Sequence, residues 1–161
     1  MYEKSIELLN KSVADELAAV HQYMYFHFHC EDQGYELLSS LFSRTAIKEM
    51  THIEKLAERI LFLKGEVIMK AAEEVKPVQD VAEMLRIARA MEEGSAKEYN
   101  EFAVECGKNA DAVTKQLFEE LVGDEEGHYA QFDIELENIK KFGDSYLALQ
   151  SIERSRSRGE D

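Results

Sequence analysis

The sequence predicts an all-α protein, built as a bundle of four long helices with a short fifth helix after it. The chain of 161 residues contains a single proline, Pro77. Apolar residues recur at helical spacing over four long stretches, which leaves little room for strands. Glycines follow three of these stretches, and glycine is the usual residue just beyond a helix C-terminus.

The first two helices are predicted over about 3–33 and 36–64, with Gly34 and Gly65 as their terminators. Only a tight turn separates the two helices. A tight turn brings the second helix back along the first, so we expect the pair to be antiparallel.

The third helix is predicted over about 80–108, because Asp80 and Glu83 form a capping-box-like start, and the fourth over about 111–142. The connection before the third helix, 65–79, is unusually long for a compact domain. About 15 extended residues reach about 50 Å, while a helix of about 28 residues is about 42 Å long. The connection can therefore span the bundle, which makes the second and third helices parallel.

Asp144 is expected to begin the short fifth helix, over about 144–155, before a charged tail, 156–161. A helix this short does not fold alone. We expect its apolar residues to pack on the end of its own bundle or on a neighbouring subunit. The length of the chain fits one domain, 1–161, of which about 3–142 is the bundle.

The chain is acidic, with a net charge of −14 from 33 acidic and 19 basic residues. This charge disfavours nucleic acid and anionic membranes as partners and favours cations, although an acidic surface often serves only solubility. No apolar run reaches the roughly 18 residues of a membrane helix, and the N-terminus does not resemble a signal peptide. A cytoplasmic location is therefore expected.

The pattern Glu-x-x-His occurs twice, at 49–52 and 125–128, and a lone glutamate lies 33 positions before each copy. Residues three apart share one face of a helix and can hold a single ion. A shift of 76 positions superimposes the two halves and also pairs Tyr23 with Tyr99. The doubled pattern predicts six ligands for two metal ions, namely Glu16, Glu49, His52, Glu92, Glu125 and His128.

These acids interrupt the apolar stripes of all four helices, which argues against a solvated helix face. Four carboxylates in an apolar core each carry a desolvation cost of several kcal/mol, and two divalent ions neutralise them. One imidazole per metal favours iron or manganese over copper, and a closed cysteine-rich zinc site is excluded, although zinc can act as an inhibitor. A single-crossover bundle with these ligands is the arrangement of ferritin-like proteins.

Cys30 and Cys106 do not form a close metal motif, and we interpret them as reduced thiols. Each lies 14 residues beyond its lone glutamate, on helices that are expected to be antiparallel. The two thiols are therefore about 21 Å from the metal site at opposite ends and cannot form a disulfide within one chain. A small buried residue at each end is the favoured interpretation, and redox pairing between chains is the alternative.

Four segments resemble the bacterioferritin family, namely DELAAVHQY at 15–23, EMTH at 49–52, ERILFL at 58–63 and DEEGH at 124–128. The resemblance covers nearly the whole chain. It implies a hollow 24-subunit shell that stores ferric mineral, with a ferroxidase centre in each subunit that oxidises Fe(II) with dioxygen or peroxide. A ferredoxin-type reductant is expected as a further partner.

The resemblance implies that the six residues are the ligands of two iron ions, with Glu49 and Glu125 bridging the pair. Tyr23 corresponds to a nearby phenol that acts as a hydrogen-bond partner or one-electron donor, and a simple core tyrosine is the alternative. Arg44, Thr45 and Lys48 depart from the pattern. Some bacterioferritins carry acidic or imidazole groups there, which are thought to pass iron to the cavity.

Met50 matches the family methionine that binds haem iron from each of two chains across a two-fold axis. A two-fold interface requires a self-complementary face, and an apolar outward stripe suits such a seam. A plain methionine in a dimer core is the alternative. The stripe consists of Leu17, His21, Met24, Phe28, Ile47 and Met50.

Two other functions compete with iron storage. The first is a peroxide-reducing di-iron protein that resembles rubrerythrin. Three features argue against it, namely the lack of a four-cysteine rubredoxin module, the presence of Met50 and the predicted fifth helix. The second is a structural acidic bundle or cage that binds metal incidentally.

Overall fold

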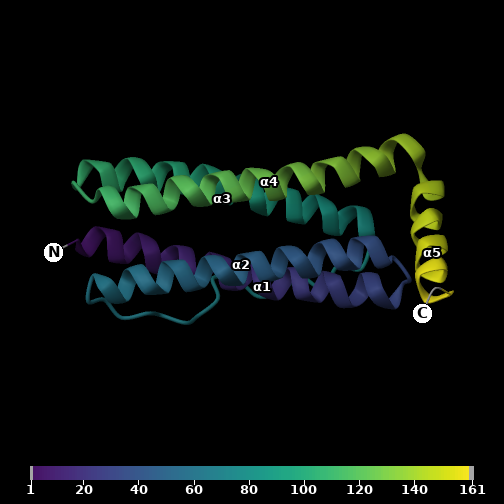
Figure 1. Cartoon of the computed structure of the whole chain (residues 1–161), viewed down its shortest axis with the longest axis horizontal. Helices are drawn as coiled ribbons and strands as arrows, with labels where there is room; N and C mark the ends of the chain where they lie inside the picture. The colour runs from purple at the N-terminus through teal and green to yellow at the C-terminus, as the bar shows by residue number, and fades with distance from the viewer. Residues whose placement is uncertain (1, 160–161) are drawn as a thin grey trace.

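The computed structural model describes residues 2–159, and in that part of the chain it contains five helices and no strand (Figure 1). This architecture confirms the predicted four-helix bundle with a long crossover and a fifth helix. No helix among the described residues is long and apolar enough to cross a membrane. The helices are α1 Glu3–Asp32, α2 Glu36–Phe62, α3 Val81–Lys108, α4 Ala112–Phe142 and α5 Asp144–Gly159.

The crossover between α2 and α3 runs along α1. The Asn10 side chain bonds the backbone of Glu66 and Ile68, both at 2.9 Å. Three turns further along α1, the Gln22 amide bonds both backbone groups of Lys76, at 2.8 and 3.1 Å. The crossover therefore travels in the same direction as α1, and α3 starts at the end of the bundle where α2 also starts, so α2 and α3 are parallel (Figure 1).

Helix α2 ends at Phe62, two residues before the predicted end at about 64, and Lys64 adopts the left-handed conformation, with φ 66°. Gly65 N–H still donates to the Ile60 carbonyl at 2.9 Å, which ends the helix. A Cβ at position 65 would lie 2.8 Å from Ile6 Cγ2. Glycine is required at this position by the close approach of α1 and not by a positive φ.

Two apolar clusters fill the bundle, one on each side of its middle. Phe26, Phe42 and Phe132 belong to one cluster, with Cys30; Leu56 and Phe118 belong to the other, with Cys106. Both thiols are buried, and neither forms a disulfide. The core is therefore divided, and the polar residues of the centre lie between its two halves.

Helix α5 lies across one end of its own bundle (Figure 1). The Gln150 side chain accepts a hydrogen bond from Leu38 N–H at 3.2 Å, and Leu147 packs against the nearby apolar cluster. Leu149 and Ile152 remain exposed. The helix continues to Gly159, past the predicted end at 155, because no proline or glycine interrupts it earlier. Residues 160 and 161 of the predicted tail lie outside the described part.

Candidate metal centre

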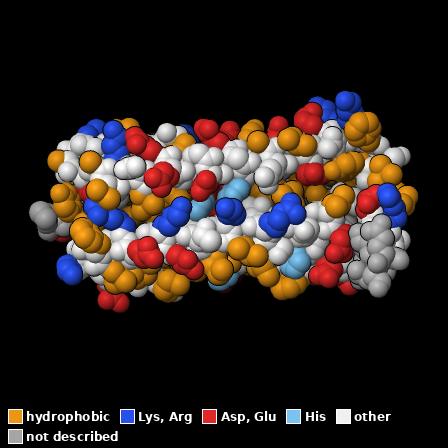
Figure 2. Space-filling view, in the orientation of Figure 1, with side chains coloured by type: hydrophobic (Ala, Val, Ile, Leu, Met, Phe, Trp, Pro, Cys, Tyr) orange, Lys and Arg blue, Asp and Glu red, His pale blue; other side chains and the backbone are white. Residues whose placement is uncertain are grey.

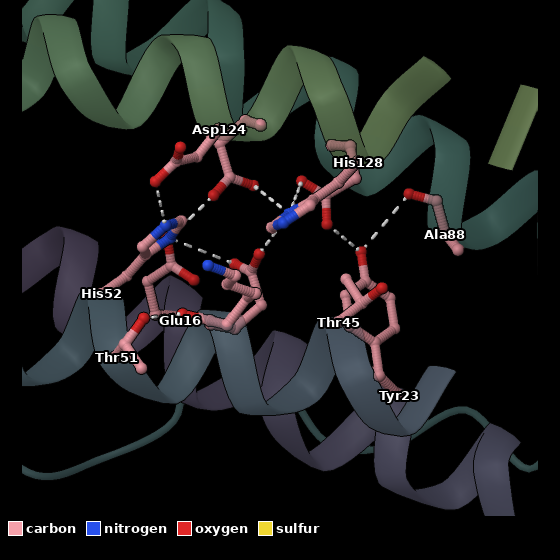
Figure 3. Close-up of polar contacts among 12 residues, drawn as sticks. Glu16, Tyr23, Thr45, Thr51, His52, Ala88, Asp124 and His128 are labelled. Carbon is pink, nitrogen blue, oxygen red and sulfur yellow. Dashed lines mark hydrogen bonds and ion pairs between the residues drawn. The ribbon is translucent and has the colours of Figure 1, made fainter. Parts of the chain in front are cut away.

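Six buried side chains meet at the middle of the bundle (Figure 3). They come from all four long helices, and the most exposed of them, His128, is only 8% exposed. The three-residue spacing in α2 and in α4 places a glutamate and a histidine on the inward face of each helix. The six are Glu16 from α1, Glu49 and His52 from α2, Glu92 from α3, and Glu125 and His128 from α4.

The six side chains form two overlapping groups of four. Within each group, one potential ligand atom per residue lies within 4.8 Å of the others. Each group has one histidine and one glutamate of its own, and both groups share the same two glutamates. This geometry can hold two ions with two carboxylates between them. The groups are Glu16, Glu49, His52 and Glu125, and Glu49, Glu92, Glu125 and His128.

Both histidines turn Nδ1 towards the centre. His52 Nδ1 lies 2.9 Å from Glu125 Oε1, and His128 Nδ1 lies 2.7 Å from Glu49 Oε1. The outer nitrogens differ. His52 Nε2 lies 2.9 Å from Asp124 Oδ2, a contact that orients the ring, whereas His128 Nε2 has no hydrogen-bond partner among residues 2–159.

Two buried tyrosines hold the outer glutamates in a symmetric arrangement. The Tyr23 hydroxyl donates to Glu92 Oε1 at 2.6 Å, and the Tyr99 hydroxyl donates to Glu16 Oε1 at 2.5 Å. Burial, and next the negative charge of these glutamates, raises the pKa of both phenols well above the ordinary value. Both tyrosines are therefore protonated donors that fix carboxylate orientation.

Tyr99 and Asp124 were not among the predicted site residues. For Tyr99 a signal exists in the sequence, because the shift of 76 positions pairs it with Tyr23. For Asp124 the same shift leads to Lys48, a residue of opposite charge, so the repeat could not reveal it. Only the packing of α4 beside α2 brings Asp124 to His52.

The titration of the centre reflects its crowded negative charge. Burial first, and then neighbouring carboxylates, raises the pKa of Glu49 and Glu125 well above the ordinary value. Burial also opposes ionisation of Glu16, but hydrogen bonds, that of Glu49 first, lower its pKa overall. For His52 and His128, burial favours the neutral ring, yet contacts with the carboxylates raise the pKa of both. Without metal ions, protons supply the positive charge that the core requires.

Several buried atoms of the centre have no hydrogen-bond partner. For example, His128 Nδ1 lies only 2.7 Å from Glu49 Oε1, but the two atoms are not aligned as in a hydrogen bond. Unpaired buried polar atoms are rare in native proteins, and atoms that face a common point fit metal ligands. Carboxylate oxygens with one imidazole nitrogen per ion suit iron or manganese. The atoms are Glu16 Oε2, Glu49 Oε1, Glu92 Oε2, Glu125 Oε1 and Oε2, and His128 Nδ1.

A cavity of about 290 Å³ approaches the centre from the α1 and α3 side. It reaches Tyr23 and Glu92, and its outer lining includes Asp15 and Glu98. Lys11 contacts both of these outer carboxylates. The cavity is mainly acidic, so it suits a cation that approaches the centre.

A second cavity, of about 430 Å³, lies between α2 and α4 and reaches His128. It is lined by Arg44, Thr45 and Lys48, the three residues expected to depart from the pattern of some bacterioferritins. The Thr45 hydroxyl is bonded to the Leu41 carbonyl at 2.8 Å. The two approaches to the centre therefore carry opposite charge.

Met50 points away from the centre, although it follows Glu49 directly in the sequence. Its side chain is 47% exposed, while Glu49 is 1% exposed. The predicted apolar stripe lies on the surface of α1 and α2, with half-buried and exposed members. Leu17 and Met24 are half-buried, and His21, Phe28, Ile47 and Met50 are exposed.

The structure is that of a ferritin-like protein, because a four-helix bundle with a long crossover holds two carboxylate and histidine groups at its middle. The family model of the ferritin-like domain matches residues 6–142. Bacterioferritins are similar to this chain over most of their length. The bacterioferritin of Desulfovibrio desulfuricans is 37% identical over 145 residues, 90% of this chain and 81% of the relative. That of Brucella melitensis is 36% identical over 141 residues, 88% of each chain. The chain belongs to the bacterioferritin family.

The fold agrees closely with a solved relative. The X-ray structure of the Desulfovibrio desulfuricans bacterioferritin superposes with a TM-score of 0.90 at 36% sequence identity. The match covers 92% of this chain and 86% of the other. That structure is described as showing the diiron site in different catalytic states.

Proposed function

We propose that this protein is an iron-storage ferroxidase. The observation that carries the proposal is the pair of four-residue groups that share Glu49 and Glu125 at the middle of the bundle. Its support from relatives is the diiron site of a bacterioferritin with 36% sequence identity to this chain. In this proposal both ions are iron, and the six buried residues are their ligands.

The substrate is Fe(II), and two ions give one electron each to dioxygen, which takes up two protons and leaves as hydrogen peroxide. A further pair of Fe(II) ions and two protons reduce the peroxide to water. The shared glutamates hold the two ions together during this electron transfer, and each histidine holds one. Tyr23 and Tyr99 keep the outer glutamates in place.

The mineral is stored in a hollow 24-subunit shell, built from two-fold dimers that meet along the α1 and α2 stripe. Exposed apolar side chains at Phe28, Ile47 and Met50 support an interface there. Met50 of two subunits would bind one haem across the two-fold axis. We place the protein in the cytoplasm, where a ferredoxin-type protein would reduce the mineral.

The mass of the native assembly and its iron capacity test the proposal. We expect an assembly on the order of hundreds of kilodaltons that takes up many irons per chain after addition of Fe(II) in air. A dimer that saturates at two irons per chain would favour the rubrerythrin-like alternative and contradict storage.

A matched pair of variants tests the centre itself. Glu125→Gln removes a shared carboxylate, so stopped-flow absorbance should show loss of rapid Fe(II) oxidation. Glu126→Gln changes the exposed neighbour and should oxidise iron at the wild-type rate. Circular dichroism should show the same helix content in both, since Glu125→Gln also relieves like-charge crowding. Equal rates in the two variants would refute the assignment.

A further inference from the structure

The cavity between α2 and α4 is basic, although the chain has a net charge of −14. Figure 2 shows Lys and Arg side chains that follow one another along the middle of this face, beside exposed histidine atoms. The cavity is lined by Arg44 and Lys48, with Gln131 and Thr51 nearby and His128 on the side of the metal centre. A basic approach repels a metal cation and attracts an anion.

Several hydrogen-bond donors of this cavity are free to bind a ligand. The hydroxyls of Thr45 and Thr51 are taken, since they donate to backbone carbonyls at 2.8 and 2.6 Å. Arg44 uses one nitrogen, Nη1, to bond Ser40 Oγ at 3.2 Å, which leaves its other N–H groups available. Lys48 has no ion pair among residues 2–159.

The two ends of the metal centre also differ in their outer partners. On one side, Asp124 Oδ2 lies 2.9 Å from His52 Nε2. The shift of 76 positions that relates the two halves places Lys48 where the other half has Asp124. The ring of His128 turns Nδ1 inward, so Nε2 is the nitrogen that can donate towards the cavity, and it has no acceptor within the described residues. Since Nε2 is not among the buried unpartnered atoms, it is open to a ligand or to solvent in the cavity.

We propose that this cavity binds one phosphate-class oxyanion per chain, held by Arg44, Lys48 and the Nε2–H of His128. A tetrahedral oxyanion offers acceptor oxygens in several directions, which matches donors from two helices. The Arg44 guanidinium suits two parallel hydrogen bonds to such a group, and Lys48 adds a point charge. The anion would contact Nε2 of His128 and orient its ring, as Asp124 contacts Nε2 of His52.

The nearby acids do not oppose this binding strongly. Glu49 and Glu125 approach Nδ1 of His128 from inside the bundle, whereas the proposed donor is Nε2, and metal ions would neutralise these glutamates in the loaded protein. Glu135 lines the neighbouring cavity beside Arg44, and its carboxylate is engaged by the Tyr146 hydroxyl. The site needs no iron chemistry, so it stands or fails independently of the proposed function.

Binding of inorganic phosphate to the metal-free full chain tests the proposal. Isothermal titration calorimetry at pH 7, with ionic strength held constant by sodium chloride, should show saturable binding of one phosphate per chain. Arg44→Gln and Lys48→Gln should each weaken the affinity roughly tenfold, as expected for loss of a charge-assisted hydrogen bond. Absence of saturable binding in the wild-type protein would overturn the proposal.

Lys55→Gln is the matched control. Lys55 belongs to the same helix as Lys48 but lines a different cavity, which also contains Glu58 and Glu120. Its loss should change phosphate affinity by less than about twofold. If Lys55→Gln weakens phosphate binding as much as Lys48→Gln, phosphate is attracted by the positive charge of the whole face, and the proposed site does not exist. Circular dichroism of each variant excludes unfolding as the cause of a loss.

Discussion

Tyr99 of α3 donates a hydrogen bond of 2.5 Å to Glu16 of α1, on the opposite side of the centre from the Tyr23 contact with Glu92. Each phenol therefore belongs to one of the two metal groups. Hydrogen bonds to metal ligands hold the ligand in one orientation and tune its basicity. The two halves of the centre can be perturbed separately through these tyrosines.

Tyr99→Phe should weaken metal binding in the group that contains Glu16 by about tenfold, because Glu16 loses its donor. Titration with Co(II), followed by visible absorption, measures this directly. Tyr25→Phe serves as a control, since Tyr25 contacts His29 and Gln79 outside the centre. An unchanged Co(II) affinity in Tyr99→Phe would show that the phenol is only a core residue.

Asp124→Ala should weaken the same metal group by about tenfold or more, because the Nε2 contact of His52 orients the ring and favours the tautomer with a free Nδ1. The readout is again the Co(II) spectrum, together with the rate of Fe(II) oxidation. Glu126→Gln, an exposed acid two positions away, controls for the general loss of negative charge. A similar effect in both variants would mean that Asp124 acts through charge alone.

Metal binding should release protons, and metal affinity should rise with pH. In the metal-free protein the pKa values of Glu49, Glu125 and His52 are raised, so these groups hold protons that the ions must displace. Zinc addition to weakly buffered protein with a pH indicator measures the release. The Glu49→Gln variant should release fewer protons than the wild-type protein.

The same pKa shifts set the pH dependence of stability. The folded metal-free protein keeps protons on Glu49 and Glu125 that the unfolded chain releases above a pH of about 4.5. The contribution of these two groups to stability is therefore lost as the pH rises. His52 and His128 also have a raised pKa, so their stabilising contribution is present below about 6.5 and is lost as the pH rises. Calorimetry should therefore show a lower Tm of the metal-free protein at pH 9 than at pH 6. A Tm that rises over this range would contradict the assignment.

Cys30 should not react with thiol reagents in the folded protein. Burial raises the pKa of its thiol to about 12, so only about one thiol in ten thousand is ionised at pH 8. Mass spectrometry after treatment with iodoacetamide should show no modification at Cys30 until denaturant is added. Rapid modification of the native protein would mean that the thiol is accessible, and would revive redox pairing between chains.

Haem bound at the proposed two-fold seam should have a low-spin absorption spectrum with thioether ligation. Met50→Leu removes the sulfur and should abolish this spectrum. Met69 is also exposed, at 63%, but lies in the crossover, so Met69→Leu should leave the spectrum unchanged. An unaltered spectrum in Met50→Leu would reject Met50 as the ligand.

Much of the fold could be predicted from local patterns. The capping interaction of Asp80 with Glu83 N–H, at 3.0 Å, marks the start of α3 as the sequence indicated. The end of α2 was less predictable, because Gly65 is selected by its contact with Ile6 on another helix and not by its own conformation. Helix termini that depend on distant neighbours carry no local signal.

The order of residues alone determined that four acids and two histidines would face the inside of a helical bundle. Helical periodicity places residues three apart on one face, and buried carboxylates require compensating charge. The tertiary structure alone decided what surrounds them. It brought Tyr99 to Glu16, Asp124 to His52, and Arg44 and Lys48 to the open side of His128. These contacts join different helices, so they depend on how the helices pack and cannot be read from spacing along one chain.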